Sequence, residues 1–421
     1  MAVIGVIADD FTGATDVAVA FHAGGLGTAI FFDDVDETPG PAAEVLVVGL
    51  KIRTEDPSVA VAKSLQAVRR LKSLGATRFY FKYCSTFDSR PDGNIGPVAD
   101  ALAHDLGAGS VVFVPGSPSH GRTQYRGHLF VDGLLLSESH MRNHPLTPMT
   151  DSNIPRVLAR QTQRPVSLVP IETVWSGATE IRAARESLPD DSYTVLDALE
   201  DSDLANIAAA VVDDVLVTGG ADLAGHLARL VRPGRATTPA DQDLVGIVPT
   251  AGLSGSCSKR TLEQIAEAAA AGPTYRLDIL ASQNPAELAA GALGWYDRLP
   301  SRGSAPLIYS SLPPTDLQIV QRALGAERAA HLLETAMREI ATGLVERGVR
   351  RIIVAGGETS GAVVSALGVR AGLLGEEAAP GVPWIYSRGQ TPVALLLKSG
   401  NFGDSGFFRR LLAAQSTGPS W

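Results

Sequence analysis

The sequence is short of cysteine, of long apolar runs and of positive charge, and each shortage excludes a class of protein. Its 421 residues contain two cysteines, Cys84 and Cys257, so a disulfide framework is excluded and a reducing compartment is expected. No uncharged apolar run reaches the roughly 18 residues of a membrane-spanning helix, and the chain opens on a strand pattern instead of a signal-like segment. A net charge of −9 argues against nucleic acid, whose phosphates would be repelled. We expect a cytoplasmic protein with no nucleic-acid or membrane partner.

The length and the order of apolar segments predict two α/β domains. A chain of 421 residues exceeds the size of one ordinary core. Residues 232–242, rich in proline and small polar residues, indicate a linker between domain 1–231 and domain 243–421. Strand-like segments alternate with helical patterns on both sides, which is typical of mostly parallel sheets flanked by helices. We expect the active site in the cleft between the domains. The expected strands include 3–8, 45–50, 79–83, 111–114, 166–169, 193–196, 215–218, 245–248, 275–277, 307–310 and 351–355.

Two glycine-rich turns follow apolar strands near the C-terminus. One is the sequence GGETSG at 356–361, after strand 351–355, with helix-compatible sequence resuming at Ala362. The other is KSGNFG at 398–403, after the apolar run 393–397. A strand, a glycine turn and a helix start present free backbone N–H groups and a helix dipole to an anion. These glycines could also simply form tight turns, but two such loops together favour a phosphate or nucleotide site.

A third loop of small residues, predicted at 249–258 after strand 245–248, precedes the helix 259–271. Its serines lack the spacing of a hydrolase elbow, and three loops at strand ends fit an adenine nucleotide better. The loop at 356–361 continues with Ala362 and Val363 instead of the Lys-Ser/Thr of a Walker A motif. No GxGxxG opens a helix, so neither a P-loop NTPase nor a standard dinucleotide fold is supported.

The first strand ends in two adjacent acidic residues, Asp9 and Asp10. Ligands of open α/β sheets bind beyond the carboxyl ends of the strands, so both carboxylates stand where a site is expected. Adjacent carboxylates repel each other and need a cation, a donor cluster or a shared proton. One of them could instead cap the following helix. The other hypotheses are a general base and a metal-bound carboxylate.

Polar residues after the third strand suit a polyhydroxy acid. The segment KYCSTFDSR at 82–90 offers a lysine, hydroxyls, a carboxylate and an arginine at one strand end. Cations would hold the carboxylate of the ligand, and Asp88 and Asn94 would contact its hydroxyls. Cys84 as a nucleophile is the competing hypothesis, but the sequence marks no histidine partner for it.

Two further loops carry candidate ligand contacts. The loop after strand 111–114 offers Arg122 as an anion clamp. His140 and His144 have the i, i+4 spacing of a metal pair on a helix, but no HExxH glutamate lies between them and Pro145 would end that helix. We therefore expect the 140–151 stretch to contact substrate, through His144 in particular.

The motifs at 8–14, 82–88, 121–123, 356–360 and 398–403 resemble those of the four-carbon acid-sugar kinases, in the same order and over nearly the full length. The stretches at 79–97 and 144–153 look like the branch of 3-oxo-tetronate kinases. The resemblance implies an N-terminal acid-sugar domain and a C-terminal ATP domain. It also implies phosphorylation of the terminal 4-hydroxyl of a 3-oxo-tetronate, of the 3-dehydro-L-erythronate or D-threonate type, to give the 4-phosphate.

The expected site residues follow from the motifs and the resemblance together. We expect Asp10 to be the base that accepts the 4-hydroxyl proton, with Asp9 orienting it or binding metal. Mg²⁺ would bind through the ATP phosphates, with Asp9 or Asp10 as conceivable protein ligands. The expected substrate residues are Lys82, Ser85, Thr86, Asp88, Asn94, Arg122 and His144. The expected ATP residues are Ser256, Ser258, Gly356, Gly357, Glu358, Thr359, Ser360, Lys398, Gly400 and Gly403.

Three alternatives stay open from the sequence. Within the family the substrate could be D-threonate or D-erythronate. Outside it, the same loops could serve an NAD(P)-dependent acid-sugar oxidoreductase or a nucleotide-gated sugar-acid sensor. The sequence does not fix the oligomeric state, and a homo-oligomer is one outcome that it allows.

Overall fold

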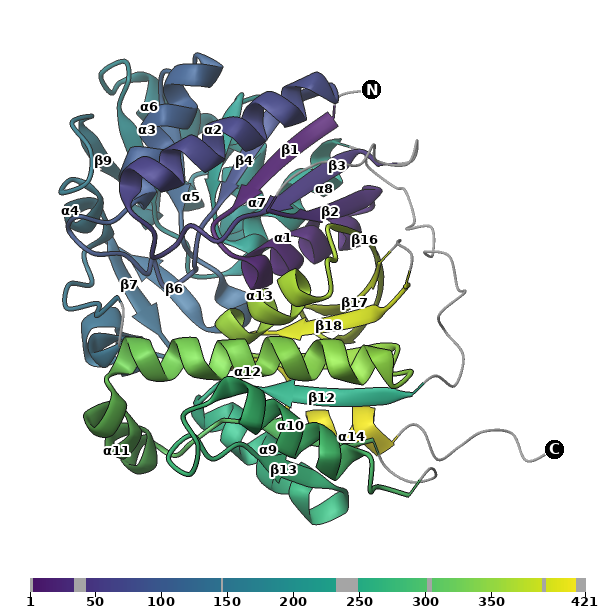
Figure 1. The fold of residues 1–421 in the computed structure, drawn as a ribbon. Coiled ribbons are helices and arrows are strands. Elements are labelled where there is room, and N and C mark those ends of the chain that lie inside the picture. Colours follow the sequence, from purple (N-terminus) through teal and green to yellow (C-terminus); the bar gives the residue numbers. More distant parts are fainter. Residues whose placement is uncertain are drawn as a thin grey trace. The chain divides into compact units, whose positions relative to one another are not determined.

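The computed structural model describes residues 3–33, 43–144, 147–231, 249–300, 305–387 and 391–413. It divides into an N-terminal unit, Met1–Thr238, and a C-terminal unit, Pro239–Trp421. Each unit has mostly parallel strands flanked by helices, so the expected fold class is confirmed (Figure 1). The predicted linker 232–242 and the predicted strand 245–248 lie outside the described residues.

The N-terminal unit is built on parallel strands in the order β2-β3-β1-β4-β11-β5-β10-β9. Strands covered on both faces are mainly apolar, and every residue of β2 and β3 is buried. The strands are β1 (Val3–Ala8), β2 (Thr28–Phe32), β3 (Val45–Gly49), β4 (Ala76–Lys82), β5 (Val111–Val114), β9 (Val166–Val169), β10 (Tyr193–Leu196) and β11 (Leu216–Gly219).

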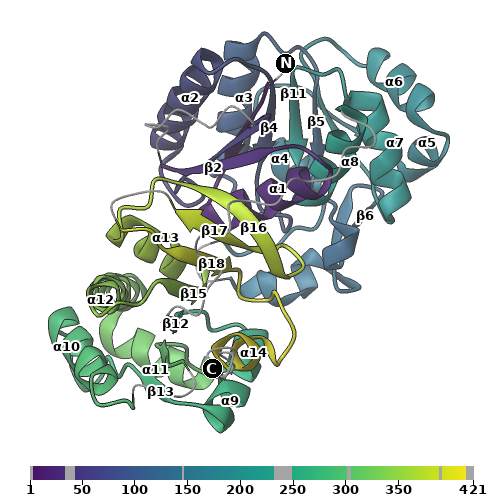
Figure 2. The ribbon, with the colours of Figure 1, turned by 90° about the vertical axis from the view of Figure 1, so that its right-hand side faces the viewer.

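Helices cover both faces of this set of strands. Helices α2 and α3 pack together on one face, and α1, α7 and α8 pack together on the other (Figure 2). Asp56 starts α2 by accepting a hydrogen bond from Ser58 N at 2.8 Å, with Pro57 at the first helical position. The helices are α1 (Phe11–Ala23), α2 (Pro57–Ser73), α3 (Ile95–Leu106), α4 (Ile154–Leu158), α5 (Ile171–Trp175), α6 (Ala178–Glu186), α7 (Asp201–Val211) and α8 (Ala221–Val231).

A small antiparallel sheet follows β5 in the same unit. It contains β6 (Arg122–Tyr125), β7 (His128–Val131) and β8 (Leu134–Leu135), with 3₁₀ turns at Pro118–His120, Leu136–Glu138 and His140–Asn143. The buried Asp197 fixes this sheet to the end of β10. Its carboxylate accepts hydrogen bonds from Arg126 N at 2.6 Å, Gly127 N at 2.8 Å and Ile171 N at 3.2 Å.

The C-terminal unit has five parallel strands, in the order β13-β14-β12-β15-β18, continued by the antiparallel strands β17 and β16. The strands are β12 (Thr250–Ser254), β13 (Thr274–Arg276), β14 (Leu307–Tyr309), β15 (Arg351–Ala355), β16 (Ala371–Ala379), β17 (Val382–Ser387) and β18 (Ala394–Lys398).

Helices also cover both faces of the C-terminal strands. Helices α9 and α14 pack together on one face, and α10, α12 and α13 on the other (Figure 2). Phe407 and Phe408 of α14 pack into a buried cluster with Leu307, Ile353 and Leu396, from three strands of this unit. The helices are α9 (Lys259–Ala271), α10 (Pro285–Tyr296), α11 (Pro314–Leu324), α12 (Ala326–Glu346), α13 (Gly357–Ala366) and α14 (Phe407–Ala413).

The structure corrects two predicted element boundaries. Thr250–Ser254 is a buried strand, although it was predicted as part of a loop, because it pairs with both β14 and β15. Helix α13 begins at Gly357, whereas helical sequence was expected only from Ala362. Strand β2 and the β16–β17 hairpin were not predicted. No helix in the described part of the chain is long and apolar enough to span a membrane.

Replacing Asp197 tests how the small sheet is held. Asp197→Ala would leave the buried N–H groups of Gly127 and Ile171 and the part-buried N–H of Arg126 without an acceptor, so we expect it to lower the free energy of unfolding by about 3 kcal/mol. Urea unfolding followed by circular dichroism measures this change. The control is Asp190→Ala, at an exposed residue, which should change stability by less than about 0.5 kcal/mol. Equal stabilities for the two variants would contradict the role of Asp197.

Candidate functional site

Strand register brings the N-terminal candidate residues to one edge. Ala8, the last residue of β1, pairs with Gly49 of β3 and with Lys82 of β4. Gly219 of β11 pairs with Lys82 and with Val114 of β5. Because these strands are parallel and end in register, the loops that follow them emerge side by side.

Asp9 and Asp10 share an arginine that the sequence analysis did not single out. Arg53, in the loop after β3, forms a two-pronged pair with the buried Asp9, with Nε–Oδ2 at 2.9 Å and Nη2–Oδ1 at 2.8 Å. The same Nη2 lies 3.0 Å from Asp10 Oδ1. Asp10 Oδ1 also accepts a hydrogen bond from Gly13 N at 2.6 Å and caps α1. The capping alternative therefore holds for Asp10.

Lys82 completes this group of charges. A Cβ atom at Gly13 would lie 2.5 Å from Asp10 Oδ1, so a larger residue would push the capping carboxylate away, while Lys82 Nζ and Asp9 Oδ1 lie near the same point at 3.4 and 3.7 Å. Lys82 is buried and donates to Tyr83 O at 2.8 Å. Burial raises the pKa of the Asp10 carboxyl, and the positive charge of Arg53 opposes this shift only in part.

The loop after β4 brings Cys84, Thr86 and Asp88 together. Thr86 Oγ1 donates to Asp88 Oδ1 at 2.5 Å and lies 2.9 Å from Cys84 Sγ. Burial raises the pKa of the Cys84 thiol to about 11, which keeps it protonated at neutral pH and removes support for a nucleophilic cysteine. Ser85, the next residue, is half-buried beside them.

His144 faces the same charges from the 140–151 stretch. Its Nδ1 accepts a hydrogen bond from Thr147 N at 3.1 Å and lies 2.9 Å from Thr147 Oγ1. Burial lowers its pKa, with Asp88 and Arg53 acting in opposite directions. His140–Asn143 is a 3₁₀ turn, so the α-helical spacing expected of a His140–His144 metal pair is absent.

Asn94 holds the loop after β3 that carries Arg53, here called the arginine loop. It lies just before α3, and its buried Nδ2 donates to the carbonyl of Ile52 and lies 3.3 Å from the carbonyl oxygens of Arg53 and Glu55. The amide group that was predicted to contact a substrate hydroxyl is therefore engaged with the segment that carries Arg53.

A second polar cluster follows β5 and β11. Asp222, near the start of α8, lies 3.2 Å from His120 Nδ1 and accepts a hydrogen bond from Ser119 Oγ at 2.7 Å. Burial lowers the pKa of His120, but Asp222 and Asp16 outweigh burial and hold it above its ordinary value. The predicted Arg122 donates from Nη1 to the His120 carbonyl. The sequence signal that could have found Asp222 is its position three residues after the apolar strand β11.

Thr12 Oγ1 and Arg122 Nε are among several buried polar atoms of this unit that have no hydrogen-bond partner among the described residues, and both lie in segments that carry predicted site residues. Buried polar groups are normally paired, so these two are candidates for ligand contacts.

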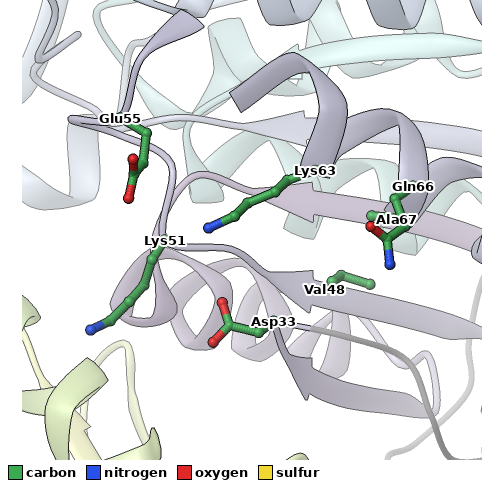
Figure 3. A pocket seen from close by; sticks show the side chains of 7 residues that line it. All are labelled: Asp33, Val48, Lys51, Glu55, Lys63, Gln66 and Ala67. Atoms are coloured by element: carbon green, nitrogen blue, oxygen red, sulfur yellow. The ribbon is translucent and has the colours of Figure 1, made fainter. Parts of the chain in front are cut away.

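A cavity of about 280 Å³ lies beside the arginine loop. Lys51 and Glu55 line it from that loop, and Lys63 and Gln66 line it from α2, opposite Asp33 (Figure 3). Its lining carries two positive and two negative side chains and includes none of the predicted site residues. We assign it no ligand.

The C-terminal unit repeats the arrangement of aligned strand ends. Ala355 of β15 pairs with Ser254 of β12 and with Lys398 of β18. The three loops predicted to bind ATP therefore start next to one another. Ser258 Oγ donates to the Gly400 carbonyl at 2.7 Å, and Thr261 Oγ1 donates to the same oxygen at 2.8 Å.

The loops approach so closely that side chains would obstruct them. A Cβ atom at Gly400 would lie 2.6 Å from Ser256 Oγ. Gly356, at the turn into α13, has a φ of 113°, which few other residues adopt. Gly403 also has a positive φ, 76°, in the third loop.

Helix α13 starts within the predicted ATP segment. Gly357, Glu358 and Thr359 open its first turn, where backbone N–H groups have no intrahelical acceptor, and Ser360 N donates to the Gly356 carbonyl at 2.8 Å. Such a turn attracts anions through its N–H groups and the helix dipole. The hydroxyl of Ser360 is fully buried and has no hydrogen-bond partner among the described residues.

Lys398 is buried beneath the third loop. Its Nζ lies 3.0 Å from the carbonyl oxygens of both Ser399 and Gly400, and 3.3 Å from Thr261 Oγ1. Burial, with a smaller contribution from Arg260, lowers its pKa to about 7. These contacts support a role for Lys398 in holding the loop that was predicted to meet the phosphates.

In comparisons with known proteins, each of the two units matches a different family model. Residues 4–227 match the model of a sugar-binding N-terminal domain, and residues 251–408 match that of a nucleotide-binding C-terminal domain. A 3-oxo-tetronate kinase of Pseudomonas fluorescens is 44% identical over 99% of this chain and 97% of its own length. The chain belongs to the four-carbon acid-sugar kinase family.

A further relative and two solved structures extend the match. A 3-oxo-tetronate kinase of Haemophilus influenzae is 39% identical over 96% of this chain and 98% of its own. A Salmonella typhimurium crystal structure, named for a tRNA synthase, is 40% identical with a TM-score of 0.86 and covers 98% of this chain and 99% of its own. A Haemophilus influenzae structure has 38% identity and a TM-score of 0.74, over 96% and 98% of the two chains.

The unpaired hydroxyl of Ser360 gives a separable test of the nucleotide site. Ser360→Ala removes no hydrogen bond within the protein, so we expect unchanged stability and an ADP affinity lowered by about 5- to 10-fold, as for a lost hydrogen bond. The control is Ser311→Ala, which removes the buried contact between Ser311 Oγ and Ser254 Oγ at 2.9 Å. This variant should lower the free energy of unfolding, with a smaller effect on the affinity for ADP. Calorimetric titration with ADP measures the affinity of each variant. An unchanged affinity in Ser360→Ala would show that this hydroxyl does not contact the nucleotide.

The lowered pKa of Lys398 predicts two opposite pH effects. The unfolded chain binds this proton up to a pH of about 10.5, and the folded chain only up to about 7, so stability without ligand should rise with pH between these values. Nucleotide affinity should fall above pH 7, because the neutral amine holds the loop carbonyls less well.

Both effects are measured against Lys398→Met, because titration of the nucleotide itself affects binding to the two proteins equally. Urea unfolding and ADP titration at about pH 6 and pH 8.5 would show pH-dependent differences between the two proteins. Parallel pH profiles for the wild type and the variant would contradict the assignment.

Proposed function

We propose that the protein is an ATP-dependent kinase that phosphorylates the terminal 4-hydroxyl of a four-carbon acid sugar, 3-oxo-tetronate. The observation that carries this proposal is the pairing of two kinds of strand-end site in one chain. One unit collects carboxylates and cations at its strand ends, and the other collects backbone loops and a helix start. Full-length relatives that bear the name 3-oxo-tetronate kinase support the choice of substrate.

The N-terminal unit has the chemistry to bind the sugar acid. Lys82 and Arg122 would hold the carboxylate of the substrate, with the unpaired Arg122 Nε as one donor. Ser85, Thr86, Asp88 and His144 are proposed to contact its hydroxyls. Asp10 is proposed as the general base, because burial raises its pKa toward the range in which it accepts a proton.

The C-terminal unit has the chemistry to bind ATP, with Mg²⁺ carried on the ATP phosphates. The first turn of α13 and the loops at 255–258 and 399–403 would bind the phosphates mainly through backbone N–H groups. In the transfer, the substrate O4 forms a bond to the γ-phosphorus, the bond to the β,γ-bridging oxygen breaks, and ADP leaves. The O4 proton passes to Asp10. We propose that the acceptor held by the N-terminal unit receives the phosphoryl group of the ATP held by the C-terminal unit.

A tRNA partner, suggested only by the name of the Salmonella protein, has less support in this chain. Its net charge of −9 would repel a polyphosphate backbone.

The experiment that tests the function is ADP release with a panel of 3-oxo-tetronates, threonates and erythronates. Saturable release with a 3-oxo-tetronate, and none without an acid, is expected. Release with threonate or erythronate alone would show that the chain phosphorylates one of these acids instead of a 3-oxo-tetronate. Binding of both ligands without turnover would support a sensor, and an NAD(P)-linked absorbance change would support an oxidoreductase.

Replacing the proposed base separates chemistry from binding. Asp10→Asn keeps an N-cap residue on α1 but loses the proton acceptor, so kcat should fall by about 100-fold or more with ADP affinity nearly unchanged. Steady-state kinetics and ADP titration measure the two effects. Turnover at the wild-type rate in this variant would show that Asp10 is not the general base.

A further inference from the structure

The Asp9–Asp10 pair poses an electrostatic problem that any mechanism at this site must solve. Two adjacent carboxylates at a partly buried strand end repel each other, and one would take up a proton unless a cation compensates them. A metal ion is the usual compensating cation in a phosphoryl-transfer site. The structure offers a different one.

We propose that Arg53 is the permanent cation of the Asp9–Asp10 pair, in the place that a metal ion would otherwise take, and that it positions Asp10 for the acceptor hydroxyl. The positioning role rests on the kinase function proposed above. The charge-compensating role does not.

The contacts of Arg53 use most of the carboxylate oxygens. Asp9 is 2% exposed, and both of its oxygens are engaged by the guanidinium, at 2.8 and 2.9 Å. Asp10 Oδ1 is engaged by Arg53 Nη2 at 3.0 Å and by Gly13 N at 2.6 Å. Among the described residues, Asp10 Oδ2 makes no hydrogen bond. This leaves one carboxylate oxygen of the pair to face a substrate.

The arginine is fixed before any ligand binds. The backbone N–H groups of Ile52 and Arg53 both donate to the Asp9 carbonyl, at 3.1 and 3.2 Å. Asn94 holds the carbonyls of the same loop from the start of α3. Neighbouring charges act on the pair as well: Lys82 favours the ionised state of Asp10. A guanidinium anchored in this way stabilises ionised carboxylates without reorganisation.

A magnesium ion does not fit this pair. Mg²⁺ demands near-octahedral oxygen coordination, and the oxygens of Asp9 are already bound to a cation. The described residues contain no group of three or more histidine, cysteine, aspartate or glutamate side chains that could hold a metal. The expectation that Asp9 binds metal is therefore replaced by Asp9 as the partner of Arg53.

The test compares three arginine variants. Arg53→Met removes the charge, Arg53→Lys keeps the charge without the two-pronged geometry, and the control Arg78→Met removes a surface pair with Asp213 at the other end of β4. Arg53→Met should lower kcat by about 100-fold or more, with ADP affinity within about 2-fold. Arg53→Lys should recover part of kcat, and Arg78→Met should match the wild type.

Metal binding supplies a readout that does not need turnover. Electron paramagnetic resonance of Mn²⁺ without nucleotide should show no ion bound at this pair in the wild-type protein. Mn²⁺ binding that Asp9→Asn abolishes would overturn the proposal, as would wild-type kcat in Arg53→Met. This arm uses the wild-type fold, so it decides even if Arg53→Met fails to fold. Absence of turnover with every acid would instead contradict the proposed function.

Discussion

The parallel register of strand ends is the constraint on which both candidate sites depend. In the N-terminal unit β1 pairs with β3 and β4, and Ala8, Gly49 and Lys82 end together. In the C-terminal unit β15 pairs with β12 and β18, and Ser254, Ala355 and Lys398 end together. Residues far apart in the sequence therefore meet at the ends of the strands.

The two sites use opposite electrostatic means. The N-terminal site is made of charged side chains that compensate one another, with Arg53 bridging Asp9 and Asp10. The C-terminal site relies on backbone groups, and the buried Lys398 contacts carbonyls and a hydroxyl beneath the loop. A sugar acid is recognised by cations and hydroxyl acceptors, whereas phosphates suit backbone N–H groups at a helix start.

Sequence patterns predicted much of this, because strand ends and glycine turns are local signals. Strands such as β5, β9, β10 and β15 and helix α9 were placed at their observed bounds. Arg53 and Asp222 were missed because their partners, Asp9 and His120, lie far away in the sequence. Asn94 was identified, but its contact with residues 52–55 depends on tertiary packing that no local pattern shows. Helix α13 was started too late because its first turn is composed of glycine and hydroxyl residues that also suit a loop.

The most direct test of the central claim is ³¹P nuclear magnetic resonance of the product formed from ATP and a 3-oxo-tetronate. A phosphate on the terminal oxygen lies next to a CH₂ group, so its proton-coupled signal should be a triplet that grows as ADP appears. A doublet would place the phosphate on a secondary hydroxyl. Inorganic phosphate as the sole new signal would contradict the account, because the chain would then hydrolyse ATP without transferring its phosphoryl group to the sugar acid.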